Sequence, residues 1–364
     1  MFGLTTIRNW YGKFERPISS FSLIGGFVFD AIFLKRVDLF WENFWIFVHL
    51  AVVAICIVLI NLRKYRTEEE TDPSKLHFWY VNILQFFFGG LLSTFLVFYF
   101  RSATLSASWP FFLILGLAFV ANERLKRHFS RLEFQISLLF LCLFSFLIFY
   151  VPVLVHSINQ WTFVLSGFLS LVIITVFLRL LSRFSKENLF GHKHKLIISI
   201  AGIFLVMNVL YFTNIIPPLP LSLKDSGIYH AVLHNSNGDY VIQTENESWW
   251  QKYFALYPDF HLVSGDVVYA FSSVFSPESF NTSIVHEWQY FNQKTNDWTT
   301  EGKVSLSVAG GRGGGYRTYS ARVDLNSGHW RVNVLTLSGL VLGRLRFNVV
   351  PVVVEPILNT KISQ

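Results

Sequence analysis

The sequence contains one segment whose residues could bind a phosphate group, the glycine-rich stretch 310–318. A phosphate-binding loop needs Lys followed by Ser or Thr after its glycines, and then a helix. Tyr316 stands there instead, and 317–323 reads as a strand, which also excludes a dinucleotide-binding loop. Two interpretations remain. The glycines form a wide hairpin loop with positive φ angles, or their N–H groups form an anion-binding nest that Arg312 and Arg317 complete.

The histidines do not predict a metal site or a protease. His286-Glu287 begins like the zinc-binding helix of a protease, but Tyr290 occupies the place of the second histidine. His230 and His234 would share a face only on a helix, whereas their stretch reads as extended. The chain has no Gly-x-Ser-x-Gly motif, so a standard hydrolase triad has no anchor. We therefore expect no metal and no cofactor.

Tryptophans form a second group of candidates. Trp288 and Trp330 lie in strand-like patterns that predict core positions. Trp249, Trp250 and Trp298 fit packing as well, or a platform for sugars or lipid headgroups. Aromatic residues recur at helical spacing in 245–257, so this stretch is expected to form a short amphipathic helix.

Two ionisable residues lie inside apolar segments, where such residues are functional candidates by default. Asp30 is about one turn from the end of its segment and close to Lys35 and Arg36, so local pairing would also explain it. His49 lies about a third of the way into the next segment. No chain of acids crosses the apolar region, which argues against a proton pump.

These residues must be positioned by a membrane domain followed by a second domain. A helix needs about 20 apolar residues to cross a bilayer. Seven segments are candidates, of which the first is short and the least certain: 18–34, 41–61, 78–100, 103–121, 134–155, 161–181 and 196–216.

The basic residues that flank these segments predict the orientation. Sixteen lie on one side of the predicted membrane and three, Lys35, Arg36 and Arg101, on the other. The positive-inside rule then places the N-terminus in the cytoplasm. With seven crossings, everything after Pro217 lies outside, which in a bacterium is the periplasm.

The net charge also separates the two parts. The first 220 residues carry 19 Lys and Arg against 11 acids, a net charge of +8, whereas the remainder carries −1. The basic loops fit contact with anionic membrane lipids, and no basic face predicts nucleic-acid binding. Cys56 and Cys142 both lie in apolar segments, so the second domain must fold without disulfides.

The predicted domains are a transmembrane domain (1–216), a proline-rich linker (217–222) and a β domain (223–364). The prolines of 217–220 cannot continue a helix. Beyond them, alternating stretches such as 304–308 and 330–334 are separated by turn signals. Short strands at this spacing predict an all-β, Ig-like sandwich.

The blocks at 310–320, 328–332 and 339–344, in this order, resemble a bacterial domain of unknown function, number 2914, usually found at the C-terminus of inner-membrane proteins. The resemblance implies an envelope protein with a small β domain and supplies no activity.

We therefore expect a membrane-anchored envelope protein whose β domain binds a partner protein, a glycan or a lipid headgroup. The alternative is a lipid- or glycan-modifying transferase whose site lies at the periplasmic interface of the inner membrane. Under this alternative, Asp30, His49, Arg312 and Arg317 would be the functional residues.

Overall fold

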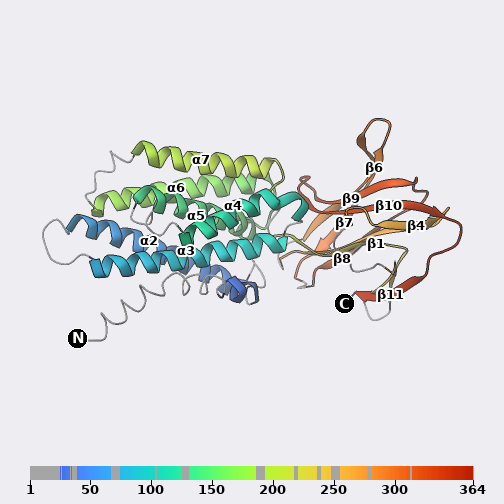
Figure 1. The fold of residues 1–364 in the computed structure, drawn as a ribbon, viewed down its shortest axis with the longest axis horizontal. Helices are drawn as coiled ribbons and strands as arrows, with labels where there is room; N and C mark the ends of the chain where they lie inside the picture. The colour runs from blue at the N-terminus through green and yellow to red at the C-terminus, as the bar shows by residue number, and fades with distance from the viewer. Residues whose placement is uncertain are drawn as a thin grey trace. The chain divides into compact units, whose positions relative to one another are not determined.

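The computed structural model describes residues 25, 27–32, 34, 39–66, 74–102, 105–124, 131–185, 193–216, 220–235, 239–246, 255–277, 281–311 and 314–363 (Figure 1). The chain divides into a helical unit, Met1–Phe100 with Trp109–Ile216, and a second unit, Arg101–Ser108 with Pro217–Gln364, which contains all the strands and is called the β unit.

Within the described residues, the helical unit contains six long helices, which match the second to the seventh predicted segments. They are α2 (Phe40–Arg66), α3 (Ser74–Ser102), α4 (Leu105–Arg124), α5 (Leu132–Val155), α6 (Gln160–Ser185) and α7 (Lys193–Phe212). All except α4 contain an apolar stretch long enough to cross a membrane, and α4 has a shorter one, Phe111–Val120. Of the first predicted segment, residues 27–32 are helical and most others lie outside the described residues. The seventh crossing therefore stays a prediction.

Helix α5 is the centre of this bundle, because α2, α6 and α7 all pack against it. Buried polar groups join the helices at defined heights. Asn61 of α2 donates a hydrogen bond of 2.9 Å to the side-chain oxygen of Gln135 in α5. Ser166 of α6 donates one of 2.9 Å to the backbone oxygen of Leu147. Because an unpaired polar group is costly in an apolar interior, these bonds favour one helix register.

The connection between α5 and α6 shows how the sequence sets helix ends. His156 adopts a left-handed conformation with φ 54° and ends α5. Asn159 then caps α6, since its side-chain oxygen accepts hydrogen bonds from the backbone N–H groups of Trp161 and Thr162.

The β unit contains eleven strands within the described residues: β1 (Ser222–Tyr229), β2 (Ala231–His234), β3 (Tyr240–Glu245), β4 (Asp259–Val263), β5 (Val268–Phe275), β6 (Asn281–Asn292), β7 (Asp297–Ala309), β8 (Tyr316–Arg322), β9 (Gly328–Thr336), β10 (Val341–Val352) and β11 (Leu358–Ser363). They form three sheets with the orders β1-β5-β8, β4-β10-β9-β6-β7 and β11-β3-β2. All pairs are antiparallel except β4 with β10.

The sheet β1-β5-β8 packs against the five-stranded sheet to form a sandwich. Their shared core contains Val268 and Ala270 of β5, together with Trp288 and Trp330 of the five-stranded sheet. Each tryptophan is 1% exposed, which confirms the core positions predicted for both. Alternate residues along β9 and β10 point into this core, as a half-buried strand requires.

The predicted two-sheet sandwich is incomplete, because a third sheet lies on the other side of β5. Val232 of β2 and Ile242 of β3 form a second core with Phe271 of β5. Strand β5 is therefore buried on both faces, which explains why it is apolar or small almost throughout. The sheet β1-β5-β8 is the middle one of three layers.

The predicted hairpin at the glycine-rich segment is wrong. Strand β7 before it belongs to the five-stranded sheet, and β8 after it belongs to the middle sheet, where it pairs with β5. The segment is a crossover between layers. Gly315 has φ 93°, and a Cβ there would lie 2.5 Å from the side-chain oxygen of Ser273 and 3.1 Å from the backbone of β5. Glycine is thus required by close backbone approach as well as by φ.

Candidate anion-binding face

Three arginines lie on the outer face of the five-stranded sheet. Arg331 of β9 follows the buried Trp330, and Arg344 and Arg346 of β10 flank the buried Leu345. Because side chains alternate along a strand, all three point away from the core. The strand register then places Arg331 directly opposite Arg346. We call Arg331, Arg344 and Arg346 the arginine face.

Neutral amide side chains hold two of these guanidinium groups. Arg331 donates a hydrogen bond of 2.6 Å from Nε to the side-chain oxygen of Gln289 on β6. Arg344 donates one of 3.0 Å to Asn333 on β9. Asn333 in turn donates to Gln289 at 3.1 Å and to Glu287 at 3.0 Å. The Nε atoms are occupied, and the terminal guanidinium nitrogens of Arg331 and Arg344 make no hydrogen bond within the described part of the chain.

No carboxylate among the described residues forms an ion pair with these three arginines, although the charge of Glu287 attracts Arg331 and Arg344 from a distance. Glu287 is the nearest acid, but its carboxylate forms an ion pair of 3.0 Å with Lys303. Burial alone would raise the pKa of Glu287, but hydrogen bonds from Asn333 and Lys303 and the charge of Lys303 outweigh it and lower that pKa. Burial, followed by repulsion from neighbouring arginines, lowers the pKa of Arg331 and of Arg344. Like charges opposite one another destabilise a sheet, so this arrangement favours a function for the charges.

Trp298 positions one of these arginines. The guanidinium of Arg331 lies over the Trp298 ring, 4.1 Å from its centre. Tyr257 is nearly parallel to the same ring at 6.4 Å, and Phe291 contacts it at 5.2 Å. The ring thus contacts neighbours in this chain, which agrees with packing, one of the two roles expected for Trp298. Cation–π contact of this kind orients a guanidinium and leaves its N–H edge available.

The chemistry of the arginine face is that of an anion receptor. Each guanidinium presents a planar set of donors that matches two oxygens of a carboxylate, phosphate or sulfate. Gln289 and Asn333 fix the two guanidiniums before any ligand arrives, which lowers the entropy cost of binding.

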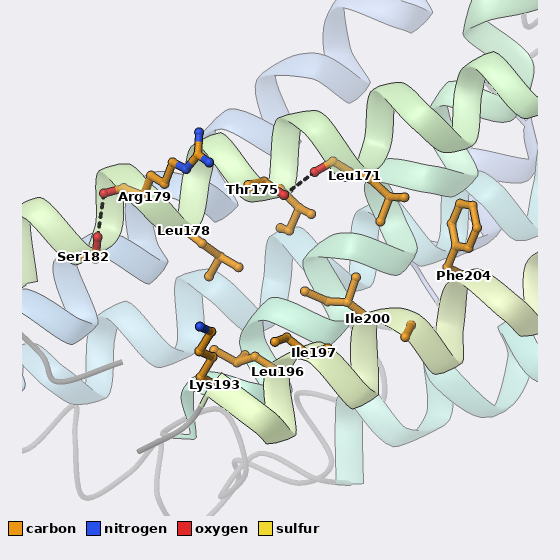
Figure 2. A pocket seen from close by; sticks show the side chains of 12 residues that line it. Leu171, Thr175, Leu178, Arg179, Ser182, Lys193, Leu196, Ile197, Ile200 and Phe204 are labelled. Carbon is orange, nitrogen blue, oxygen red and sulfur yellow. Dashed lines mark hydrogen bonds between the residues drawn. The ribbon is translucent and has the colours of Figure 1, made fainter. Parts of the chain in front are cut away.

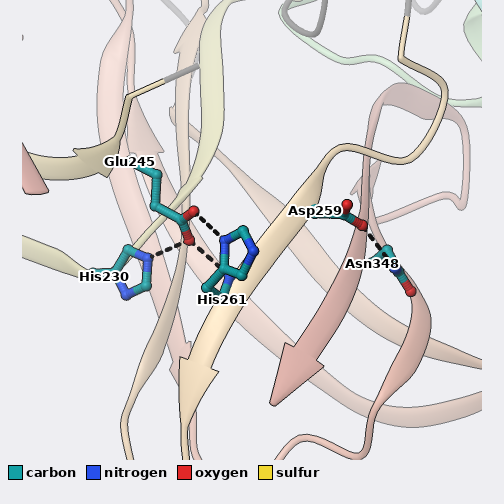
Figure 3. A network of polar contacts seen from close by, with 5 residues as sticks. All are labelled: His230, Glu245, Asp259, His261 and Asn348. Carbon is teal, nitrogen blue, oxygen red and sulfur yellow. Dashed lines mark hydrogen bonds and ion pairs between the residues drawn. The ribbon is translucent and has the colours of Figure 1, made fainter. Parts of the chain in front are cut away.

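A second polar cluster joins the small sheet to the edge strand β4 (Figure 3). Glu245 at the end of β3 contacts His230 at 3.0 Å and the ring of His261 at 2.6 Å, and accepts a hydrogen bond of 2.7 Å from the backbone N–H of His261. The His230 ring also stacks on Phe260 at 4.1 Å. Burial would raise the pKa of Glu245, but the hydrogen bonds from both histidines outweigh it and lower the pKa. Within the described residues no group of three or more His, Cys, Asp or Glu is arranged to hold a metal ion. The cluster therefore connects the small sheet to the five-stranded sheet.

His286 lies in a buried polar layer inside the sandwich. Its ring nitrogens lie 2.8 Å from the hydroxyl of Ser272 and 2.9 Å from that of Ser320, and Trp288 donates to Ser320 at 3.0 Å. Burial lowers the pKa of His286 to about 4, so the ring is neutral near pH 7. A Ser–His pair could serve nucleophilic catalysis, but both residues are 0% exposed and no substrate can reach them.

Of the remaining predicted residues, none that the structure describes joins the arginine face. Arg312, Trp249 and Trp250 lie outside the described residues, as does most of the helix predicted for 245–257. Arg317 lies on β8, as predicted for its strand. The neighbouring Thr318 contacts Ser272 inside the sandwich, so Arg317 points to the opposite side of the middle sheet, away from Trp298.

Asp30 and His49 both lie against α3. Asp30 is close to Ser93. The His49 ring contacts Phe87, and a Cβ on Gly90 would lie 3.2 Å from it. His49 also bonds the backbone oxygen of Trp45 through Nδ1 at 2.9 Å and is 9% exposed. These contacts are those of a packed histidine in a helix interface.

The sequence reasoning missed the arginine face. Arg344 and Arg346 are separated by one apolar residue, and this signal predicts that they share the exposed face of a strand. What the sequence does not reveal is the β9–β10 register, which brings Arg331 beside them.

Strand β9 and most of β10, which carry the arginine face, lie within a family match. Residues 281–349 match the model described as Protein of unknown function (DUF2914). This confirms the resemblance stated from the three sequence blocks. The DUF2914 match includes every residue of the arginine face, but its description supplies no activity. Curated proteins give no match to this sequence.

Two solved structures resemble parts of the chain. An immunoglobulin-like protein from Pseudomonas aeruginosa is 12% identical over 35% of this chain and 95% of its own, with a TM-score of 0.21. The alkylpurine DNA glycosylase AlkC from Pseudomonas fluorescens, bound to DNA, is 8% identical over 83% of this chain and 96% of its own, with a TM-score of 0.22. Neither overlap supports the transfer of a function.

Proposed function

We propose that this protein is anchored in the bacterial inner membrane and that its β unit binds an acidic glycan of the envelope through the arginine face. The N-terminus would lie in the cytoplasm and the β unit in the periplasm. The observation that carries the proposal is the set of three arginines that form no ion pair with a described residue, two of which are held by neutral amides.

The exposed side chains of the helices support the membrane anchor. Phe86 is 66% exposed, Phe168 61%, Ile198 70% and Leu205 64%. Water would penalise so many exposed apolar groups, whereas lipid tails accommodate them. Trp161, at the start of α6, is 72% exposed, which fits an aromatic residue at the membrane interface.

The make-up of the arginine face supports a glycan over a folded protein as ligand. A tight protein interface is centred on large apolar or aromatic anchors that enter a pocket. Here the centre is formed by Arg331, Arg346 and Asn333, on a sheet face whose nearest aromatic ring, Trp298, already contacts neighbours in this chain. Charged and amide groups in rows suit a polymer that carries repeated carboxylates or phosphates and many hydroxyls.

The test uses the full-length protein in detergent and two probes: purified lipopolysaccharide, and a carboxylated polysaccharide such as polygalacturonate. We expect the wild type to bind both probes, and this binding should weaken as the salt concentration increases. The R331Q/R346Q variant should not bind. Lys361 is exposed on β11 in another sheet, so K361Q is the matched control and should bind normally. Equal binding by wild type and R331Q/R346Q would refute the arginine face as the site.

A further inference from the structure

Helices α6 and α7 are in side-chain contact at one end, and a groove separates them toward the other end. Near the close end, Phe163 stacks on Tyr211 with ring centres 3.7 Å apart. One turn further, Gly167 leaves room for Phe204, whose ring would lie 3.0 Å from a Cβ at that position. Beyond Phe204 both helices continue toward the connection between them, and a groove of about 780 Å³ opens.

The groove is apolar along its length and basic at its open end (Figure 2). Leu171, Ile174 and Leu178 line it from α6, and Ile197 and Ile200 from α7. The hydroxyl groups in this region do not make it polar, because Thr175 and Ser182 donate to backbone oxygens of their own helix. The interior therefore offers a hydrocarbon surface.

Two basic residues, Arg179 and Lys193, line the open end. In Figure 2 the Arg179 guanidinium projects away from the Lys193 ammonium, and neither group forms an ion pair with any described residue. Lys193 is the first residue of α7, whose first turn contains no acid. The free N–H groups and the dipole of a helix start favour an anion, so the charge at this end comes from two side chains and the helix.

The dimensions match one lipid in one leaflet. From Ser182 to Leu171 the groove follows eleven residues of α6, which is about 16 Å of helix. Half of a hydrocarbon core is about 15 Å thick. An acyl chain in the groove would thus reach Phe204 while its headgroup stayed at the level of Arg179 and Lys193.

We propose that the α6–α7 groove is a binding site for one anionic phospholipid, with its phosphate on Arg179 and Lys193 and an acyl chain along the apolar walls. This inference rests on the membrane anchor proposed above and is independent of the arginine face. A neutral phospholipid of equal chain length would lose the net charge attraction and bind less well.

The experiment is native mass spectrometry of the full-length protein, mixed with equal amounts of phosphatidylglycerol and phosphatidylcholine of the same acyl chains. We expect one retained phosphatidylglycerol on the wild type and loss of this preference in R179A/K193A. Arg183 is exposed on α6 outside the groove, so R183A is the control and should keep the preference. A201F narrows the groove and should reduce retention of both lipids, whereas L205F, on the exposed face of α7, should not.

Three results would overturn the proposal. The first is equal retention of both lipids by the wild type, and the second is a lipid preference that R179A/K193A leaves intact. The third is a lipid-free dimer that A201F converts to a monomer, because the groove would then bind a second copy of the chain. A separate experiment treats membranes with alkaline carbonate. Release of the protein by this treatment would refute the membrane anchor itself.

Discussion

At the scale of single residues, the β unit contains charges and polar groups that reduce its stability. Arg331 and Arg346 are directly opposed across two strands, and His286 occupies a place in the sandwich core that an apolar residue could fill. Such conflicts with local stability are expected mainly at functional sites. The arginine face agrees with this rule, whereas His286 serves to join two sheets.

The opposed arginines predict a gain in stability when one is neutralised. R346Q should raise the free energy of unfolding of the β unit by up to about 1 kcal/mol, because it removes repulsion between cross-strand like charges. Urea denaturation of residues 221–364 would measure this, since both cores of the β unit are formed within that segment. The gain should shrink in high salt, and a loss of stability in R346Q would show that Arg346 is held by attractive contacts.

His286 predicts how stability depends on pH. Its folded pKa of about 4 lies below the ordinary value of 6.5, so the unfolded chain binds more protons between these values. The stability is therefore complete above pH 6.5 and is lost as the pH falls toward 4, by about 3 kcal/mol in all. Between pH 6.5 and 5 most carboxylates are still ionised, but the other histidines of the β unit also titrate, so the difference in slope between wild type and H286Q in urea denaturation reports on His286. H286Q should be less stable at pH 7 and lose less stability across that interval, and an equal slope in both proteins would contradict the assignment.

At the scale of elements, local patterns predicted the strands but not their partners. The alternation of 330–334 indicated a strand, and β9 contains it. The glycine-rich segment was interpreted as a hairpin because a run of glycines signals a turn without indicating which strands it joins. The three-layer arrangement was missed for a similar reason: Phe271 looks like any core residue, and only the chain path shows that it faces a third sheet.

The crossover predicts different roles for adjacent glycines. G315A should destabilise the β unit by more than about 1 kcal/mol, because alanine disfavours φ 93° and its Cβ would collide with β5. Gly314 has an ordinary φ and open space at its Cβ position, so G314A should change stability little. Thermal unfolding of the two variants provides the comparison. Equal losses would mean that the backbone of this segment is not held as described.

At the scale of the whole molecule, the basic residues that flank the apolar segments predict an orientation, since they act through the membrane and not through packing. This orientation stays a prediction. The ligand sites could not be predicted in this way, because the arginine face depends on strand register and the α6–α7 groove on the angle between two helices. Asp30 and His49 were candidates by position alone, and packing explains His49.

The orientation can be tested directly. A reporter that is active only in the periplasm should be active when fused after Pro220 and silent when inserted between Ser185 and Lys193. The opposite pattern would reverse the proposed topology, and activity at both places would show that the helices between them do not fix one orientation.

The pairing of β3 with β11 has a consequence for the order in which the β unit folds. Leu358 is the register partner of Glu245, so more than one hundred residues must be made before the two strands can meet. Closing so long a loop is slow compared with forming β6 and β7, which are neighbours in sequence. Strands β6 and β7 should therefore acquire protection from hydrogen exchange early, and β11 last. During that interval β3 has an open edge, and newly made molecules are then most exposed to proteases and to pairing with one another.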